Sequence, residues 1–258
     1  MHIGKAFKQT ARALLCGMAM LVIAPASLFA QQVRIAIAAN LQPVIKALQQ
    51  DFKQRTGIET EAIPGPSGAL ATQIKNGAPY DVFLSADTTF PNQLFKSGFA
   101  TAKPVIYAQG ALIICSTQNL DVAHWQTLLK SVSVQKIAIG NPAIAPYGKA
   151  AEEALKHEHV YANVQAKLVL GESIAQVNTY ITTGVVQAGF TTLSLVKDTI
   201  NKTPFYYQLI NPRFYKPIEQ GMVLIKQATP NTNAGKFYRY ILSPAAKKIF
   251  ISYGYQVK

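Results

Sequence analysis

Cysteine is nearly absent from this sequence. The 258 residues include two cysteines, Cys16 and Cys115, which is too few for a framework of disulfide bonds. Cys115 ends the apolar run Ala111–Cys115, and this position favours a buried strand residue over a reactive thiol. The stability of the fold must therefore come from hydrophobic burial, and a chain of this length can bury one large core or two smaller ones.

Acidic residues are also scarce, but the basic excess is not concentrated in one segment. Twelve Asp and Glu stand against 25 Lys and Arg, giving a formal net charge of +13. No run of five or more like charges occurs, and no residue pattern of a common DNA- or RNA-binding module is present. We interpret the charge as a solvated basic surface that attracts anions weakly at physiological salt, and we expect no nucleic-acid partner.

The sequence lacks a recognisable catalytic or metal-binding set. His157-Glu158-His159 looks like a ligand cluster, but helical residues two apart point to different faces, and a zinc site needs further ligands. Gly65–Ala69 (GPSGA) resembles a nucleophile elbow, except that Ala69 replaces the second glycine. No general base can be placed near Ser67, so an exported hydrolase remains only a minor alternative. We expect no enzyme activity and no cofactor.

The N-terminal segment predicts export. Lys5, Lys8 and Arg12 precede an apolar run, 13–23, that is shorter than the roughly 20 residues of a membrane-spanning helix. A lipoprotein modified at Cys16 is disfavoured because the large Leu15 precedes it. We expect residues 1–30 to be a signal peptide cleaved after Ala30. Its removal takes away three positive charges and no acid, leaving a periplasmic chain with a net charge of +10.

Strand and helix patterns alternate along the rest of the chain, which is typical of sheets covered by helices. Predicted strands are 33–38, 58–63, 81–84, 136–139, 168–170, 188–191 and 221–225, with a long apolar stretch at 105–116. Predicted helices follow Asn40 (as far as Gly57), Ser67, Tyr147 and Ser173, and two more span 234–242 and 244–253. The pattern predicts an α/β protein of two lobes, each a mainly parallel sheet. Lobe I comprises 31–108 and 219–258, lobe II comprises 109–218, and crossover segments lie near 107–117 and 217–225.

Small polar residues recur where a predicted strand meets a predicted helix. Asn40 and Ser67 are placed to cap helices, and Tyr147-Gly148 and Ser173-Ile174 open two more. Helix N-termini present unpaired N–H groups and the positive end of the dipole, so several that converge make an anion site without any cation. Each residue taken alone is an ordinary cap; together they indicate a binder of an anion or of a small polar solute.

At these junctions the sequence resembles the periplasmic molybdate-binding proteins of ABC transporters. The resemblance spans nearly all of the chain after residue 30, in the order of that family. It rests on 38–41 (AANL), 65–71 (GPSGALA), 77–87 (GAPYDVFLSAD), 141–142 with 145–151 (NP, APYGKAA), 171–174 (GESI), 188–190 (AGF), 217–221 (PIEQG) and 242–244 (LSP).

The resemblance implies a type II periplasmic binding protein with its ligand in the cleft between the lobes. It implies an anion shell of hydroxyls and amides without charged partners, formed by Asn40, Ser67, Tyr147, Ile174 and Thr192. Tyr147 and Ile174 are expected to donate through the backbone, and Asn40 through its side-chain amide. Pro66 stands where the family commonly has a residue with an N–H, so one possible donor is lost.

The implied ligand is molybdate, with tungstate expected to bind similarly, and the implied partners of a monomeric protein are a membrane permease and an ATPase. Because none of the five residues is acidic, a protonated phosphate is disfavoured. Sulfate or a small carboxylate in the same fold remains the alternative.

Overall fold

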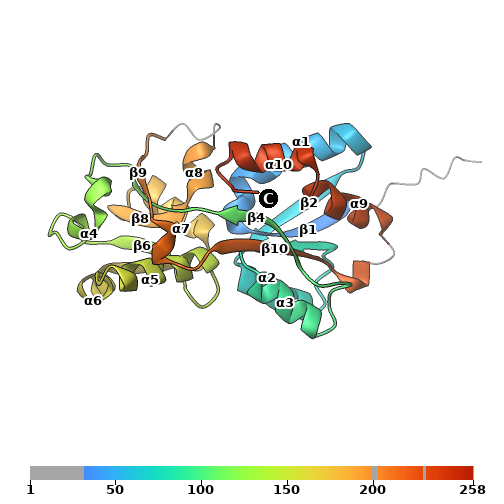
Figure 1. Ribbon diagram of the computed structural model, residues 1–258, viewed down its shortest axis with the longest axis horizontal. Helices are drawn as coiled ribbons and strands as arrows, with labels where there is room; N and C mark the ends of the chain where they lie inside the picture. The colour runs from blue at the N-terminus through green and yellow to red at the C-terminus, as the bar shows by residue number, and fades with distance from the viewer. Residues whose placement is uncertain (1–31, 199–202, 229–230, 258) are drawn as a thin grey trace, which may run out of the picture.

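Two five-stranded sheets form two lobes that lie side by side along the longest axis of the molecule (Figure 1). The computed structural model describes residues 32–198, 203–228 and 231–257. The predicted signal peptide and its cleavage after Ala30 lie outside these residues. Within them, no helix is long and apolar enough to cross a membrane.

The first sheet has the strand order β2-β1-β3-β10-β4. Its strands are β1 (Val33–Ala38), β2 (Thr60–Gly65), β3 (Val82–Leu84), β4 (Val105–Gly110) and β10 (Ile218–Leu224). The alternation of β1 divides its side chains between the two faces of the sheet. Ile35 and Ile37 pack in one apolar cluster with α1 (Gln42–Thr56), α9 (Thr232–Ile241) and α10 (Pro244–Ser252). Ala36 packs in another with α2 (Ser67–Lys75) and α3 (Thr89–Lys96).

The second sheet repeats this arrangement with the order β7-β6-β8-β5-β9. Its strands are β5 (Leu112–Ser116), β6 (Ile137–Gly140), β7 (Leu168–Gly171), β8 (Ala188–Thr192) and β9 (Tyr206–Leu209). Its helices are α4 (Trp125–Leu128), α5 (Pro146–His157), α6 (Tyr161–Val164), α7 (Ile174–Thr182) and α8 (Leu193–Lys197). Short 3-10 helices are η1 (Ala39–Leu41), η2 (Val122–His124), η3 (Gln165–Lys167), η4 (Pro212–Phe214) and η5 (Lys226–Ala228).

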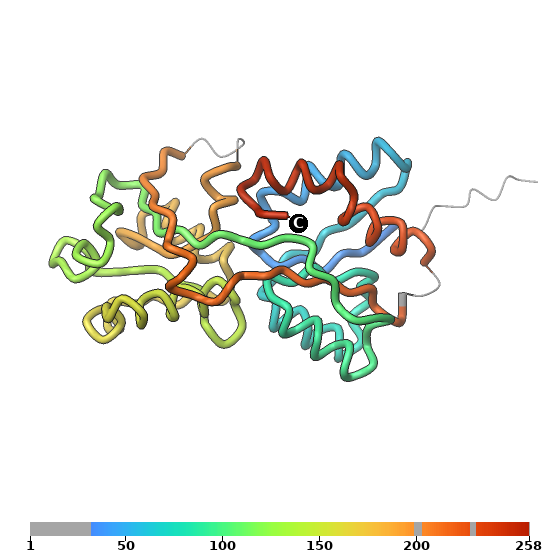
Figure 2. Tube along the Cα trace, viewed as in Figure 1, coloured from blue at the N-terminus to red at the C-terminus, as the bar shows by residue number. Residues whose placement is uncertain are grey.

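The chain passes between the lobes twice, as predicted. It leaves the first sheet from β4 into β5 and returns from β9 into β10, and the two passages run alongside each other (Figure 2). The predicted two-lobed α/β fold is confirmed, but each sheet is mixed and not mainly parallel. In each lobe a crossing strand, β10 or β5, inserts antiparallel beside the parallel β2-β1-β3 or β7-β6-β8 set.

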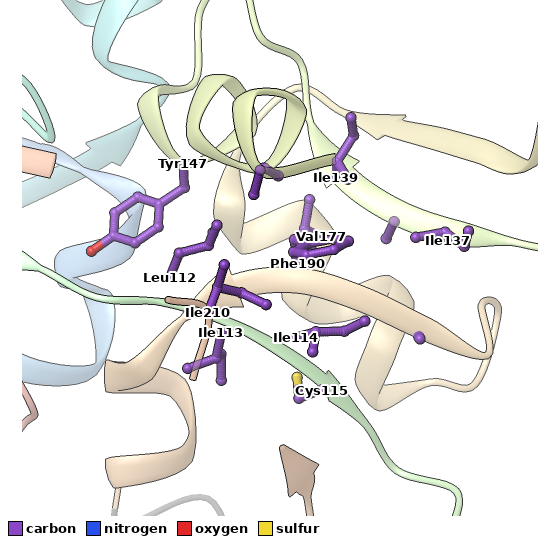
Figure 3. Packing of buried hydrophobic residues seen from close by; sticks show 14 of the residues in the cluster. Leu112, Ile113, Ile114, Cys115, Ile137, Ile139, Tyr147, Val177, Phe190 and Ile210 are labelled. Atoms are coloured by element: carbon purple, nitrogen blue, oxygen red, sulfur yellow. The ribbon is translucent and has the colours of Figure 1, made fainter. Parts of the chain in front are cut away.

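The second lobe is built on one large apolar cluster, part of which Figure 3 shows. Cys115 lies within it on β5 and is fully buried, as predicted. Burial raises the pKa of its thiol to about 12, so the thiolate form is suppressed at neutral pH. Cys115 therefore contributes packing and no nucleophile.

Candidate functional site

Four of the five predicted site residues surround one small cavity between the lobes. Its volume is about 10 Å³. The lining consists of twelve residues, and four of them are predicted site residues: Asn40, Ser67, Tyr147 and Ile174. All twelve lining residues are uncharged. A space of this volume holds about one water-sized group.

The four residues meet because each follows the carboxyl end of a strand. Asn40 lies in η1 after β1, and Ser67 is the first residue of α2 after β2. Tyr147 lies in the first turn of α5 after β6, and Ile174 opens α7 after β7. Adjacent parallel strands end at the same edge of a sheet, and residues that follow these two edges line the same cavity. Three helices, each at least nine residues long, therefore direct the N–H groups of their N-termini towards the same cavity.

The Ser67 hydroxyl is held in place by the backbone. The helix cap is Pro66, so the prediction that Ser67 caps α2 is wrong; Ser67 lies one residue inside the helix. Its Oγ accepts a hydrogen bond from the N–H of Ala86 at 3.1 Å, which leaves its own proton to be donated. Because this partner is a donor and not a base, the contact does not activate Ser67 as a nucleophile.

The Asn40 side chain is buried and only half satisfied. The prediction that it caps the following helix is wrong, because it lies within η1 and makes no cap contact. Its Nδ2 donates to Gln220 Oε1 at 3.1 Å and to the Tyr255 hydroxyl at 3.0 Å. Its Oδ1 is buried with no hydrogen-bond partner among the described residues.

The Tyr147 side chain points from the second lobe towards the first. Its ring extends away from the other labelled residues of the cluster, with the hydroxyl directed towards the first lobe (Figure 3). That hydroxyl accepts hydrogen bonds from Gln220 Nε2 at 3.3 Å and from Thr192 Oγ1 at 3.2 Å. Thr192 is buried and contacts Tyr147, so the structure places it behind the cavity wall and not in the lining.

Direct contacts between the lobes close the cleft around the cavity. The Gly68 N–H of α2 donates to the Ile144 carbonyl, which precedes α5, at 3.2 Å. On the other side, Ser194 Oγ donates to the Asn40 carbonyl at 3.0 Å, and Tyr255 OH lies 3.3 Å from Ser194 Oγ. The cavity therefore lies between residues of the two lobes that also contact each other directly.

Four residues of this buried network escaped the sequence analysis: Tyr107, Ser194, Gln220 and Tyr255. The Tyr107 hydroxyl donates to the Ser85 carbonyl at 3.0 Å and lies 2.9 Å from Gln220 Oε1. Tyr107 and Gln220 lie on the neighbouring strands β4 and β10. No local pattern marks any of the four. The one signal is that Gln220 lies in the stretch 217–221, which is among those that carry the family resemblance.

The network stays uncharged at neutral pH. Burial is the largest cause that raises the pKa of Tyr255 to about 12 and the pKa values of Tyr107 and Tyr147 well above the usual value of 10.0. All three hydroxyls thus keep their protons, and no tyrosinate stands beside the cavity.

These raised pKa values predict a loss of stability in alkali. The unfolded chain loses the tyrosine protons first, so this stabilisation is complete below pH 10.0 and falls as the pH rises from there towards about 12. We expect a decrease in the free energy of unfolding of about 1 kcal/mol per tyrosine between about pH 9 and about pH 11. Urea unfolding at both pH values measures it, and Tyr255→Phe should make the pH dependence less steep; an unchanged slope would contradict the assignment.

The comparisons with known proteins agree with this fold. A family model described as bacterial extracellular solute-binding protein matches residues 33–256. The chain belongs to this family. Its similarity to ModA, the molybdate-binding protein of Azotobacter vinelandii, is 34% identity over 227 residues, covering 88% of this chain and 90% of ModA. The ModA of Rhodobacter capsulatus is 35% identical over 247 residues, covering 95% and 94%.

Solved structures extend the likeness to three dimensions. The periplasmic molybdate-binding protein of Azotobacter vinelandii matches with a TM-score of 0.83 and 30% identity, covering 88% of this chain and 99% of that one. The sulfate-binding protein SubI of Mycobacterium tuberculosis matches with a TM-score of 0.70 at 14% identity, which shows the shared fold alone. As a member of this family, the chain is a solute-binding protein.

Proposed function

We propose that this protein captures molybdate, and also tungstate, in the periplasm and delivers it to the permease and ATPase of an ABC transporter. The observation that carries the proposal is the uncharged cavity at three helix N-termini, lined by Ser67, Tyr147 and Ile174. A fully deprotonated tetrahedral dianion accepts hydrogen bonds only, so a shell of N–H and O–H donors suits it. The names of the relatives support the same ligand.

The size of the anion provides the discrimination among dianions. Sulfate is smaller than molybdate, so in a site shaped for molybdate it leaves some buried donors without a partner, at about 1–3 kcal/mol each. Tungstate has nearly the size of molybdate and the same charge, and therefore binds similarly. Capture by an exported monomer and release to a membrane permease then follow from lobe closure and opening.

Titration calorimetry of residues 31–258 with molybdate, tungstate, sulfate and phosphate tests the proposal. Heat with the first two and none with sulfate or phosphate supports it. Heat with sulfate alone, or with no oxyanion, would overturn it. Hydrolysis of test esters that Ser67→Ala abolishes would instead favour the hydrolase alternative.

Ser67→Ala is expected to weaken molybdate binding by about 1.5–3 kcal/mol, the usual value of a hydrogen bond to a charged group. The Ser67 hydroxyl is 1% exposed and keeps its proton for the anion. Ser243→Ala is the matched control, since Ser243 Oγ also accepts a backbone N–H, from Ala246 of α10, but does not line the cavity. Equal affinities of both variants and the wild type would show that the assigned site is wrong.

A further inference from the structure

A buried acceptor lies at the wall of a site that needs donors. Asn40 is 1% exposed and lines the cavity, and its Oδ1 is the atom that lacks a partner. Its Nδ2 is occupied on the other side by Gln220 and Tyr255. A carbonyl oxygen facing a fully deprotonated oxyanion repels it, and a buried acceptor without a partner destabilises the protein even before the anion arrives.

Turning the Asn40 amide alone does not remove the conflict. Its Oδ1 would then face Gln220 Oε1, which accepts from Asn40 Nδ2 in the structure, so two acceptors would lie about 3.1 Å apart. Gln220 must turn as well for the reversed amide to be satisfied.

We propose that Asn40 and Gln220 form an amide pair that reverses together on capture of the oxyanion, which makes Gln220 a positioning residue for the ligand site. The inference rests on the proposed function. In the reversed state Gln220 Nε2 donates to Asn40 Oδ1, and Asn40 Nδ2 donates to the anion. Asn40 then supplies the donor that the site lacks beside Pro66.

The surrounding hydroxyls can follow this reversal without leaving a polar atom unsatisfied. Gln220 Oε1, turned towards Tyr147, accepts a hydrogen bond from the Tyr147 hydroxyl, which in the structure accepts one from Gln220 Nε2. Tyr107 continues to donate to the Ser85 carbonyl. The Tyr255 hydroxyl, which in the structure accepts from Asn40 Nδ2 and donates to the Asn40 backbone carbonyl, turns to donate to Asn40 Oδ1. Ser194 Oγ keeps the Asn40 carbonyl that it already binds. Burial keeps the protons on these tyrosines, so each hydroxyl reverses by rotation alone.

The reversal makes the site selective for the protonation state of its ligand. With Oδ1 at the cavity, the site would accept a hydrogen bond from the O–H of a ligand such as hydrogenphosphate. With Nδ2 at the cavity, held there by Gln220, it favours anions without protons. Because Tyr147 belongs to the second lobe, the same reversal connects the captured anion to the contact between the lobes.

A double-mutant cycle tests the pairing. Gln220→Leu is expected to weaken molybdate binding roughly tenfold to a hundredfold, because Asn40 loses the partner that holds its reversed amide. In an Asn40→Ser background the same substitution should change affinity by less than about threefold, since a serine hydroxyl orients itself. Gln208→Leu, on the exposed strand β9, is the control for replacing Gln with Leu in a strand. Equal losses in both backgrounds would reduce Gln220 to a structural role and overturn the inference.

A spectroscopic test follows the amide itself. In protein labelled with ¹⁵N-asparagine, the Asn40 side-chain amide signal, assigned by its loss in Asn40→Ser, should shift on addition of molybdate in the wild type but much less in Gln220→Leu. If molybdate does not shift the Asn40 amide signal of the wild type, the reversal is overturned, even if the Asn40→Ser variant no longer binds molybdate. If the wild type shows no calorimetric response to any oxyanion, the proposed function fails first, and the inference fails with it.

Discussion

Asn40→Asp is expected to lower the affinity for molybdate by at least about a thousandfold at about pH 8. The substitution keeps the size of the side chain and places a carboxylate in the lining of a cavity that holds no compensating charge. At about 4 Å and an effective dielectric constant of ~20, two unit charges repel each other by about 4 kcal/mol, which corresponds to roughly a thousandfold in affinity. The second charge of the dianion adds to this repulsion, so the thousandfold loss is a lower limit.

The same variant should recover affinity as the pH falls. Burial and a neighbouring anion both raise the pKa of a carboxyl group above its usual value of about 3.9, so the acid form, which can donate, becomes populated as the pH drops towards about 5.5. Calorimetry at the two pH values measures the recovery. Asn40→Ser is the control, because it removes the amide and adds no charge; its affinity should not depend on pH over this range. An Asn40→Asp protein that binds as tightly as the wild type at about pH 8 would remove Asn40 from the site.

Local sequence signals were sufficient for much of the fold. The run 33–38 was predicted as a strand and forms β1 with the same bounds, because its side chains other than Arg34 are apolar on both faces and it lies between β2 and β3. Gly57 was predicted to end the first helix, and it does so with a φ of 70°, a conformation that costs glycine little. Ser173 was predicted to open a helix, and its Oγ caps α7 by accepting the Gln176 N–H.

The elements that were missed have weak local signals. Strand β9, Tyr206–Leu209, is exposed along its whole length at the edge of the second sheet, so it shows no alternation of apolar and polar residues. Helix α3, Thr89–Lys96, is short and carries Pro91 near its start, which hides its apolar face from a periodicity analysis. The predicted strand 58–63 forms instead at Thr60–Gly65, because pairing with β1 in register, not β propensity, sets its ends.

The candidate site could be predicted only in part for a related reason. Asn40, Ser67, Tyr147 and Ile174 lie at strand-to-helix junctions, which the sequence marks. The hydrogen bonds that orient the Asn40 side chain go to Gln220, 180 residues away, and to Tyr255, 215 residues away. No local sequence pattern links such distant positions. The two wrong cap assignments, at Asn40 and Ser67, have the same origin: both side chains are buried by tertiary contacts that compete with local capping.

Gly148→Ala is expected to destabilise the protein by about 3 kcal/mol and to weaken anion binding together with it. Gly148 follows Tyr147 in the first turn of α5, and a Cβ there would collide with the Gly140 carbonyl at the end of β6 and lie 2.9 Å from the Gly140 Cα. Both obstacles are backbone, so relief requires α5 to move away from the sheet, and the Tyr147 N–H moves with it.

For a chain of this size a loss of about 3 kcal/mol lowers the melting temperature by roughly 6–12 °C, which circular dichroism can follow. Gly235→Ala is the matched control: Gly235 lies inside α9, and the nearest atom to its added Cβ would be Arg239 Nη1 at 3.5 Å. That variant should be as stable as the wild type or more stable by up to about 1 kcal/mol, since alanine favours a helix interior. Gly148→Ala could instead have the same melting temperature as Gly235→Ala and the molybdate affinity of the wild type. In that case the close approach of α5 to β6 does not position the Tyr147 donor, and other groups must bind the anion.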